Sequence, residues 1–302
     1  MSRLFIVNTL TAWDEPPRAR HQFTYALAKD HRVVFVERSK TGKKKLEIRE
    51  VQENITLVTP FHPVDYRLRY RLPVLNEIYQ KWHFRELKKQ YGDDPVVINF
   101  DFSAYRIFNC FHRVIYFCND EFKGNTRYRN YLIEIYKGYC ERQIIRKSIF
   151  CIGTSHYLYE KLLKYNQRTY EIPLGVSVVS NDITFRKAED QRVISVCLMG
   201  VINERQISIQ LVNSLLEEDT FRLVLIGSIE DAFLEKLTSR ERVTVRDVLR
   251  GKELVDALSA VDVGLALYNV KRINPGATPN KLWQYISAGI PVVISEMPNL
   301  AP

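Results

Sequence analysis

Short apolar runs alternate with stretches of helical periodicity along most of the chain. Runs rich in Val, Ile and Phe predict strands, and the amphipathic stretches between them predict helices. In the first half the predicted strands are 4–7, 33–37, 55–59, 96–100, 114–118, 150–153 and 170–173, and the predicted helices are 18–29, 75–90, 127–147 and 156–165. Uniformly apolar strands joined by helices indicate a mostly parallel sheet that is covered on both faces.

A polar stretch at residues 177–191 interrupts this alternation and is predicted to be a linker. Beyond it the predicted strands are 193–199, 222–226, 243–245, 263–267 and 291–295, and the predicted helices are 206–217, 230–239, 251–260 and 279–288. We therefore predict an α/β fold of two doubly wound, Rossmann-like domains, residues 1–176 and 192–302. Ligands of such sheets bind at the carboxyl ends of the strands.

The 302 residues carry a net charge of +9, and this charge is unevenly distributed. Residues 1–176 hold 30 Lys and Arg against 19 Asp and Glu, whereas residues 177–302 hold 14 against 16. Within the basic half, residues 66–75 and 78–89 interleave Arg and Lys with aromatic residues, a pattern that suits anionic lipid head groups. An amphipathic helix with buried aromatic and solvated basic residues explains the pattern equally well. No nucleic-acid-binding motif accompanies the charge, so nucleic acid is not an expected partner.

The cysteines and histidines favour a cytoplasmic protein without a metal site. The chain has five cysteines, an odd number, and no CxxC motif, which argues against a disulfide framework. All six histidines precede the predicted linker, and no two of them have the spacing of metal ligands. No apolar run reaches the length of a membrane span, and the first residues read as a strand rather than as a secretion signal.

The most informative segment begins after the predicted strand 263–267. Thr278 is expected to cap a helix and Pro279 to be its first residue, because both residue types favour these positions. Gly276 and Ala277 precede the cap, and their small size would let backbone N–H groups face an anion. Together with the helix dipole, these free amides favour a phosphate at this point.

Two polar side chains of the same predicted helix extend this interpretation. Lys281 would add a positive charge within the first turn, and Gln284 would reach a sugar or ribose hydroxyl one turn further on. The alternative is an ordinary capped helix whose Lys281 is solvated, since such caps are common.

The segment Thr278-Pro-Asn-Lys-Leu-Trp-Gln-Tyr-Ile-Ser-Ala-Gly-Ile-Pro-Val-Val293 resembles the donor-site signature of retaining glycosyltransferases of family 4. These enzymes have the GT-B fold, and the similarity is to their branch of teichuronic-acid and capsule transferases. Gly200-Val-Ile-Asn-Glu-Arg205 resembles the loop in which a basic residue reaches the donor diphosphate. Further segments, at residues 13–22, 152–155, 172–176, 223–227 and 258–268, agree with the family in order.

The resemblance implies a hexosyltransferase-like enzyme that needs no metal and no cofactor. It would move a sugar, with retention, from a UDP- or GDP-linked donor to a glycan or lipid-linked acceptor in cell-surface polysaccharide synthesis. With the basic half, it implies a cytoplasmic protein that is peripheral at the inner membrane face. The leaving diphosphate would be stabilised electrostatically, and its oxygen would take up the proton of the acceptor hydroxyl.

The resemblance also implies roles for particular residues of this chain. Asp120, Arg205 and Lys281 would serve catalysis, and Arg18 and His21 would lie on the acceptor side. The implied donor-binding residues are Gly200, Asn203, Arg205, Tyr268, Gly276, Ala277, Thr278, Lys281 and Gln284.

The chain departs from the family pattern at three places. Gln284 and Gly276 stand where the family usually has two glutamates, and the loop at 9–20 contains no glycine. The sequence ends at Pro302, where the family continues, so the C-terminal domain is expected to be incomplete. Gln284 favours a second hypothesis, a GT-B-fold pseudoenzyme or binding subunit. A nucleotide-sugar epimerase of the same fold is a third, although residues 177–302 contain no histidine for it.

Overall fold

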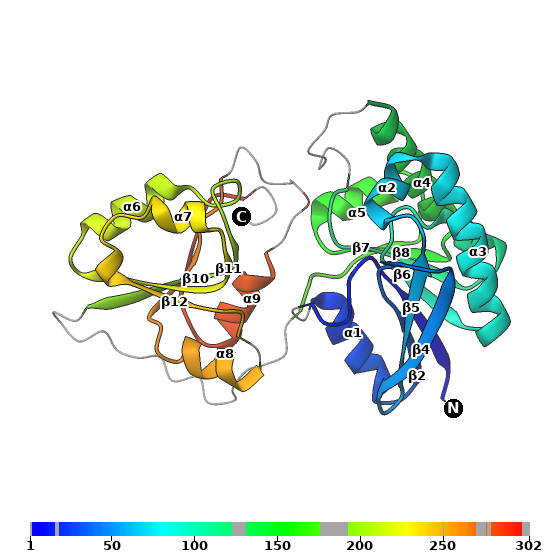
Figure 1. Cartoon of the computed structure of the whole chain (residues 1–302), viewed down its shortest axis with the longest axis horizontal. Coiled ribbons are helices and arrows are strands. Elements are labelled where there is room, and N and C mark those ends of the chain that lie inside the picture. The colour runs from blue at the N-terminus through cyan, green and yellow to red at the C-terminus, as the bar shows by residue number, and fades with distance from the viewer. Residues whose placement is uncertain are drawn as a thin grey trace. The chain divides into compact units, whose positions relative to one another are not determined.

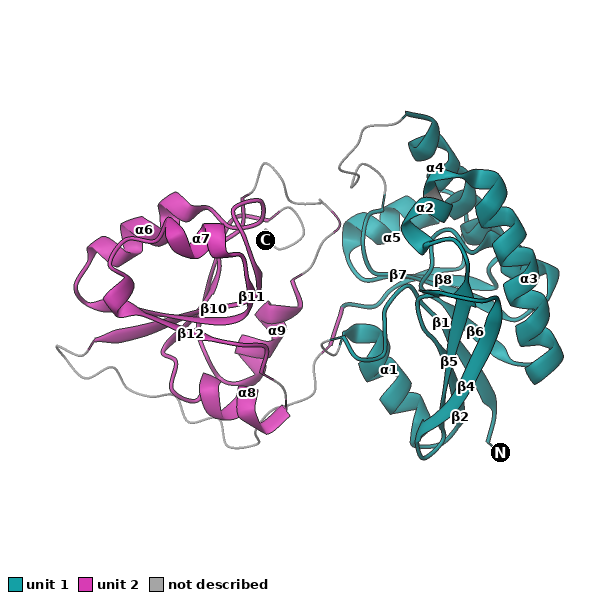
Figure 2. Cartoon of the chain, in the orientation of Figure 1, with its two compact units in different colours: residues 1–173 teal, residues 174–302 magenta. Residues whose placement is uncertain are grey.

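The computed structural model describes residues 2–15, 18–122, 131–175, 193–249, 251–269, 276 and 279–297. The chain divides into two compact units, a first unit of residues 1–173 and a second of residues 174–302 (Figure 2). Both units are α/β with largely parallel sheets, as predicted (Figure 1). The predicted linker, residues 177–191, lies outside the described residues.

The first unit is built on a nine-stranded sheet. Its strands are β1 (Leu4–Asn8), β2 (Arg32–Val36), β3 (Lys40–Thr41), β4 (Lys45–Gln52), β5 (Ile55–His62), β6 (Val96–Asn99), β7 (Val114–Cys118), β8 (Phe150–Gly153) and β9 (Thr169–Glu171). They follow the order β3-β5-β2-β1-β6-β7-β8-β9, with parallel neighbours, while β4 pairs antiparallel with β5. The β4–β5 hairpin was not predicted, because most side chains of β4 are exposed and its hydrophobic pattern is weak.

Helices cover both faces of this sheet. They are α1 (Ala19–Ala28), α2 (Tyr66–Arg71), α3 (Pro73–Tyr91), α4 (Tyr131–Lys147) and α5 (His156–Leu163), with a short 3₁₀ turn at Tyr105–Asn109. Phe84 and Leu87 pack α3 against Ile6 and Val34 of the central strands. Even-numbered residues of β7 face the side that α4 and α5 cover, whereas α1 packs on the opposite face. This period-two alternation separates the two faces of the core.

The second unit contains a five-stranded parallel sheet. Its strands are β10 (Ile194–Ile202), β11 (Phe221–Ile229), β12 (Val243–Arg246), β13 (Val263–Ala266) and β14 (Val292–Ile294), in the order β12-β11-β10-β13-β14. The helices are α6 (Ile209–Glu217), α7 (Asp231–Glu235), α8 (Gly251–Leu258) and α9 (Asn280–Ser287), with a 3₁₀ turn at Arg240–Arg242. Val212 and Phe233 anchor α6 and α7 on one face, and Leu258 and Tyr285 anchor α8 and α9 on the other.

The strands β10 and β11 run three residues further than predicted, through a pair of glycines. Gly200 lies opposite Gly227, and both have positive φ angles, +109° and +132°. A Cβ on Gly227 would overlap the carbonyl oxygen of Gly200, so only glycine fits there. The sequence pattern missed this extension because glycine carries no hydrophobic signal.

All five cysteines are buried free thiols. In the described parts of the chain, none of the helices has both the length and the hydropathy that crossing a membrane requires.

Candidate functional site

The helix α9 is held against the sheet of the second unit by Tyr285. The Tyr285 hydroxyl donates to the carbonyl oxygen of Cys197 in β10 at 2.8 Å, and its ring lies on Gly264 of β13. Any Cβ at Gly264 would overlap that ring. Because Lys281 lies four residues before Tyr285, about one helical turn, the anchor places it at the carboxyl end of β10.

Lys281 is a largely buried lysine beside the glycine at that strand end. A Cβ on Gly200 would lie 3.8 Å from its Nζ, so the ammonium lies within contact distance of this strand end. The Nζ atom lies 4.8 Å from the ring centroid of Tyr268, a cation–π distance. Burial lowers the pKa of Lys281 to about 8. No carboxylate pairs with Lys281 within the described parts of the second unit.

A tight turn follows β10 and carries two more of the predicted site residues. The buried Oδ1 of Asn203 accepts hydrogen bonds from the backbone N–H groups of Arg205 and Gln206, both at 3.1 Å. Asn203 therefore shapes the turn through its Oδ1, and a direct contact with a donor stays a prediction. The Arg205 side chain is exposed to solvent at this edge of the sheet.

The segment after β13 lies against the same turn. The backbone N–H of Asn269 donates to the carbonyl oxygen of Gln206 at 2.7 Å, and Ser295 Oγ accepts from the Tyr268 N–H at 2.9 Å. These bonds hold the Tyr268 ring beside Lys281. Gly200, Tyr268 and Lys281, predicted from separate stretches of sequence, thus meet at one sheet edge.

The start of α9 differs from the prediction. The helix begins at Asn280, and Pro279 is its N-cap with an extended ψ of 118°, so Pro279 is not the first helical residue and Thr278 is not the cap. Pro279 has no side-chain cap bond to offer, and the Leu282 N–H donates to the Pro279 carbonyl oxygen at 3.1 Å. Within the described residues, the amides of Asn280 and Lys281 have no acceptor. Gly276 is buried, and Ala277 and Thr278 lie outside the described residues.

Gln284 lies about one turn beyond Lys281 and is partly buried. Its backbone carbonyl accepts from the Ala288 N–H at 3.2 Å and from the Ser287 hydroxyl at 3.0 Å. In the described residues no hydrogen bond engages its side-chain amide. The amide therefore has hydrogen-bonding capacity left over, and its contact with a donor stays a prediction.

These features together suit an anion. A buried ammonium without a carboxylate is costly, and a ligand phosphate would neutralise it. The backbone N–H groups at the start of α9 carry partial positive charge and lie at the same end of the helix as Lys281. Gly200, at the strand end, carries no side chain that would keep a ligand from the backbone.

The first unit also gathers polar groups at the carboxyl ends of its strands. Arg20, which is buried, donates to Thr11 Oγ1 and to Asn119 Oδ1, the latter at 3.2 Å. Burial lowers the pKa of Arg20 to about 10. Asp120, next to Asn119, has a raised pKa, first because of burial. Arg20 was not among the predicted site residues, although it lies between Arg18 and His21 in the sequence.

The predicted acceptor-side residues Arg18 and His21 have different surroundings. His21 is only 2% exposed, and its Nδ1 accepts from the Arg18 backbone N–H at 3.1 Å. Its ring stacks on Phe35 at a centroid distance of 5.3 Å, and burial lowers its pKa. His21 therefore closes the first turn of α1 through Nδ1, and its acceptor-side role stays a prediction. Arg18 is exposed and pairs with Glu15 at 3.3 Å.

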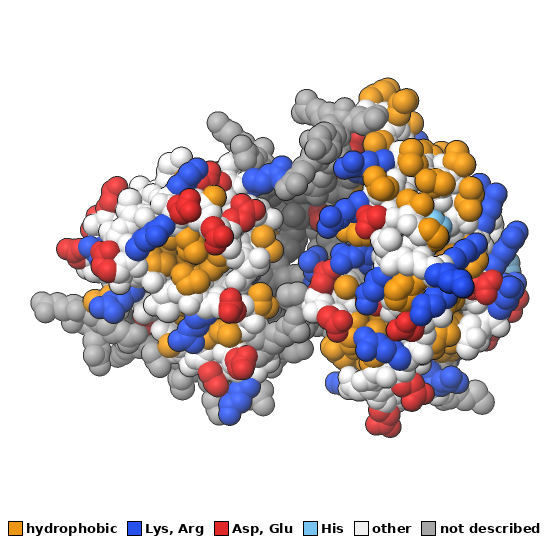
Figure 3. Space-filling model, viewed as in Figure 1, with side chains coloured by type: hydrophobic (Ala, Val, Ile, Leu, Met, Phe, Trp, Pro, Cys, Tyr) orange, Lys and Arg blue, Asp and Glu red, His pale blue; other side chains and the backbone are white. Residues whose placement is uncertain are grey.

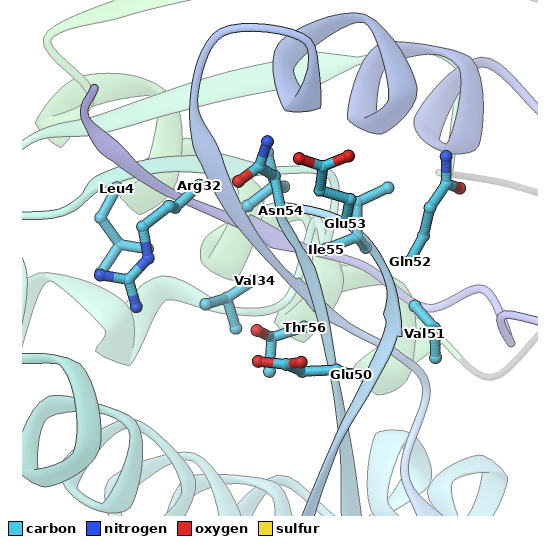
Figure 4. A pocket seen from close by; sticks show the side chains of 11 residues that line it. Leu4, Arg32, Val34, Glu50, Val51, Gln52, Glu53, Asn54, Ile55 and Thr56 are labelled. Atoms are coloured by element: carbon cyan, nitrogen blue, oxygen red, sulfur yellow. The ribbon is translucent and has the colours of Figure 1, made fainter. Parts of the chain in front are cut away.

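A pocket of about 460 Å³ lies at the opposite, amino-terminal edge of the first sheet (Figure 4). Arg32 lies on one side of it, and Gln52 at the end of β4 and Glu53 of the β4–β5 turn lie on the other. None of the predicted site residues lines this pocket. Among the described residues there is no group of three or more His, Cys, Asp or Glu that could hold a metal ion.

The sequence matches no protein-family model. None of the curated proteins matches it either.

Solved structures do share the fold. The E. coli trehalose-6-phosphate synthase bound with UDP-2-fluoro glucose matches with a TM-score of 0.67 and 12% identity over 97% of this chain and 84% of that one. Sucrose-phosphate synthase from Thermosynechococcus elongatus matches with a TM-score of 0.69 and 14% identity. The match covers 98% of this chain and 82% of that one. The lipopolysaccharide outer core galactosyltransferase WaaB matches with a TM-score of 0.64 and 14% identity. The match covers 98% of this chain and 81% of that one. The chain therefore has the fold of GT-B glycosyltransferases.

Proposed function

We propose that this protein is a glycosyltransferase that uses a UDP- or GDP-linked sugar. The observation that carries the proposal is Lys281, a partly buried ammonium without a carboxylate partner in the described residues, beside Gly200 at the carboxyl end of β10. Support comes from the shared fold with a protein that binds UDP-2-fluoro glucose and with a galactosyltransferase. The family 4 resemblance of the α9 segment adds to this.

In this proposal the second unit binds the donor. Lys281, Arg205 and the first amides of α9 contact the diphosphate, and Gly200 lets it approach the backbone. Gln284 hydrogen-bonds a hydroxyl of the ribose or the sugar. Two cations and a helix N-terminus then supply the positive charge, so no metal is part of the proposal.

Catalysis would rest on stabilising the leaving diphosphate as its charge develops. The sugar is transferred with retention: the acceptor hydroxyl attacks from the face that the diphosphate leaves, and the departing phosphate oxygen takes the hydroxyl proton. Asp120 is proposed to contact the transferred sugar, and Arg18 to serve the acceptor side. Burial raises the pKa of Asp120, which suits a carboxyl group at a closed site.

The proposed acceptor is a glycan or a lipid-linked saccharide of cell-surface polysaccharide synthesis. The proposed location is the cytoplasmic face of the inner membrane, with the protein held peripherally. The support for this location is the charge of residues 1–176, in which Lys and Arg exceed Asp and Glu by 11.

Thermal unfolding with and without UDP or GDP tests the donor site. We expect the nucleotide to raise the melting temperature of the parent protein and Lys281→Ala to remove the rise. Loss of a charged hydrogen bond costs about 1.5–3 kcal/mol, or about 10- to 150-fold in nucleotide affinity. Lys252→Ala, an exposed lysine of α8, is the matched control and should leave the rise intact.

A parent protein that neither UDP nor GDP stabilises would contradict the donor site. An equal rise in Lys281→Ala and in the parent would contradict the role of Lys281 alone.

A binding protein without catalysis is the second candidate, and Gln284 is the observation that favours it. A glutamate there would accept bonds from two hydroxyls, whereas an amide offers one accepting oxygen. Donor hydrolysis and transfer, measured in the parent and in Gln284→Glu, separate the two candidates. Turnover by the parent supports the enzyme; turnover by neither, with nucleotide bound by both, supports the binding protein.

A further inference from the structure

The solvent-facing side of α3 changes character along its length. Its exposed residues recur every three or four positions and so lie on one face of the helix. Val74 and Ile78 come first, and Lys81, Arg85 and Lys89 follow. Val74 is 71% exposed, which is unusual for a branched apolar side chain on a helix.

The helix α4 repeats this arrangement. Leu132, Ile135 and Tyr139 form an exposed apolar row over its first half, and Leu132 is 73% exposed. The last turn carries exposed Arg146 and Lys147. Two helices of one unit thus each present an apolar beginning and a basic end.

The two apolar beginnings lie side by side. Asn76 of α3 donates to the Tyr136 hydroxyl of α4 at 3.2 Å. Tyr139 packs edge-on against Tyr105, whose neighbour Arg106 pairs with Glu77 of α3. Two exposed leucines come just before α3: Leu68 in α2, and Leu72, the cap residue between α2 and α3. We call the combined set the apolar surface; its members are Leu68, Leu72, Val74, Ile78, Tyr131, Leu132, Ile135 and Tyr139.

Figure 3 shows apolar side chains gathered over the ends of α2, α3 and α4, with basic side chains beside them and along α3. The exposed basic residues nearest in sequence are Arg67 and Arg71 of α2 and Lys81 and Arg85 of α3. Contiguous exposed apolar groups with a charged rim mark an interaction site.

We propose that the apolar surface docks on an anionic lipid bilayer. Its leucines, valine, isoleucines and tyrosines would enter the interface, while the neighbouring Arg and Lys contact the negative head groups. Lipid suits this surface better than a second copy of the chain, because a two-fold contact would bring like-charged rims together. This inference rests on the peripheral location proposed above and specifies the face that makes the contact.

Co-sedimentation of the full chain with vesicles tests it. One vesicle population is phosphatidylcholine alone, and the other is phosphatidylcholine mixed with phosphatidylglycerol. We expect binding to the mixed vesicles that weakens with salt. The double variant Val74→Glu, Leu132→Glu should lose at least about tenfold in partition, because two apolar contacts become anionic. Lys81→Ser should lose about fivefold on the mixed vesicles.

The matched control is Tyr170→Glu, Ile172→Glu, which places the same charges at exposed positions of the first unit outside α2, α3 and α4. It should bind as the parent does. Nucleotide-induced thermal stabilisation, measured on every variant, confirms that each is folded and reports the donor site independently of lipid.

Three results would overturn the docking surface. The first is vesicle binding by Val74→Glu, Leu132→Glu equal to that of the parent, which would leave the membrane location intact but on another face. The second is a parent protein that binds neither vesicle, which refutes the peripheral location and leaves the donor site to the thermal assay. The third is a parent dimer that the same variant dissociates, since a second copy would then cover the surface.

Discussion

Each unit holds a largely buried lysine at the carboxyl edge of its sheet. Among the described residues, carboxylates pair with the lysine of the first unit but not with that of the second. Lys161 lies 2.9 Å from Glu121 and 2.8 Å from Glu141, and Glu141 also accepts from the Tyr116 hydroxyl. Lys281 faces the Tyr268 ring and a glycine.

The pKa values of the two lysines shift in opposite directions. Burial opposes the charge of both. In Lys161 its effect is outweighed by Cys118, Glu141 and Glu121, so the pKa rises, whereas in Lys281 burial prevails and the pKa falls to about 8. A lysine whose charge is satisfied by the fold serves stability, and one whose charge is left unsatisfied suits a ligand.

Among the substitutions at these two lysines, Lys161→Met is expected to change the free energy of unfolding most. It would leave Glu121 and Glu141 buried without their cation, and the expected loss in the free energy of unfolding is about 3–5 kcal/mol. Denaturant unfolding measures it. Lys164→Met, an exposed lysine at the end of α5, should change the same quantity by less than about 0.5 kcal/mol. If Lys161→Met lowered the free energy of unfolding only slightly, the pairs of Lys161 with Glu121 and Glu141 would not stabilise the fold as expected.

A smaller effect of opposite sign is expected from Lys281→Met. Removing a desolvated charge should raise the free energy of unfolding of the nucleotide-free protein at pH 7 by about 1–2 kcal/mol. The same substitution should abolish stabilisation by UDP or GDP. Unchanged or reduced stability at pH 7 would contradict the unsatisfied charge.

The stability gained by Lys281→Met is expected to decrease as the pH rises. The folded pKa of Lys281, about 8, lies below its ordinary value of 10.5, so the unfolded chain binds more protons between these values. The parent therefore gains stability relative to Lys281→Met as the pH rises from about 8 to 10.5. Unfolding of both proteins across this range should show the difference vanish at the alkaline end.

The smallest effect is expected from Arg18→Ala. Its pair with Glu15 is at the surface, with half of the Arg18 side chain exposed, and such pairs contribute about 1 kcal/mol or less. Thermal unfolding should thus barely change. A loss near that of Lys161→Met would mean that Arg18 does more than pair with Glu15.

The order of strands and helices was largely predictable from the chain. The strand predicted at 114–118 coincides with β7, and that at 150–153 with β8, because buried parallel strands read as short apolar runs. The strand β4 was not predicted, because its partner β5 supplies its hydrogen bonds while most of its side chains stay in water. Helix ends shifted where backbone dihedrals decided them, as at Pro279.

The candidate site was only partly predictable. Lys281 and Gln284 were assigned from their positions on one helix, and Gly200 from the resemblance of residues 200–205 to a family 4 loop. Their meeting depends on Tyr285 seating α9 on Gly264, a contact between residues 21 positions apart that no local pattern encodes. Asn203 proved to shape a turn, and His21 to close the first turn of a helix.

The sequence alone determined two α/β halves, a basic first half and a lysine at the start of a helix, since each follows from local periodicity or composition. Only the tertiary structure decided which cations are satisfied. Arg20 and Lys161 find partners from distant segments, whereas Lys281 meets a ring and a glycine. The difference arises because desolvation and pairing depend on what the fold brings near a charge, and not on the residues beside it in the chain.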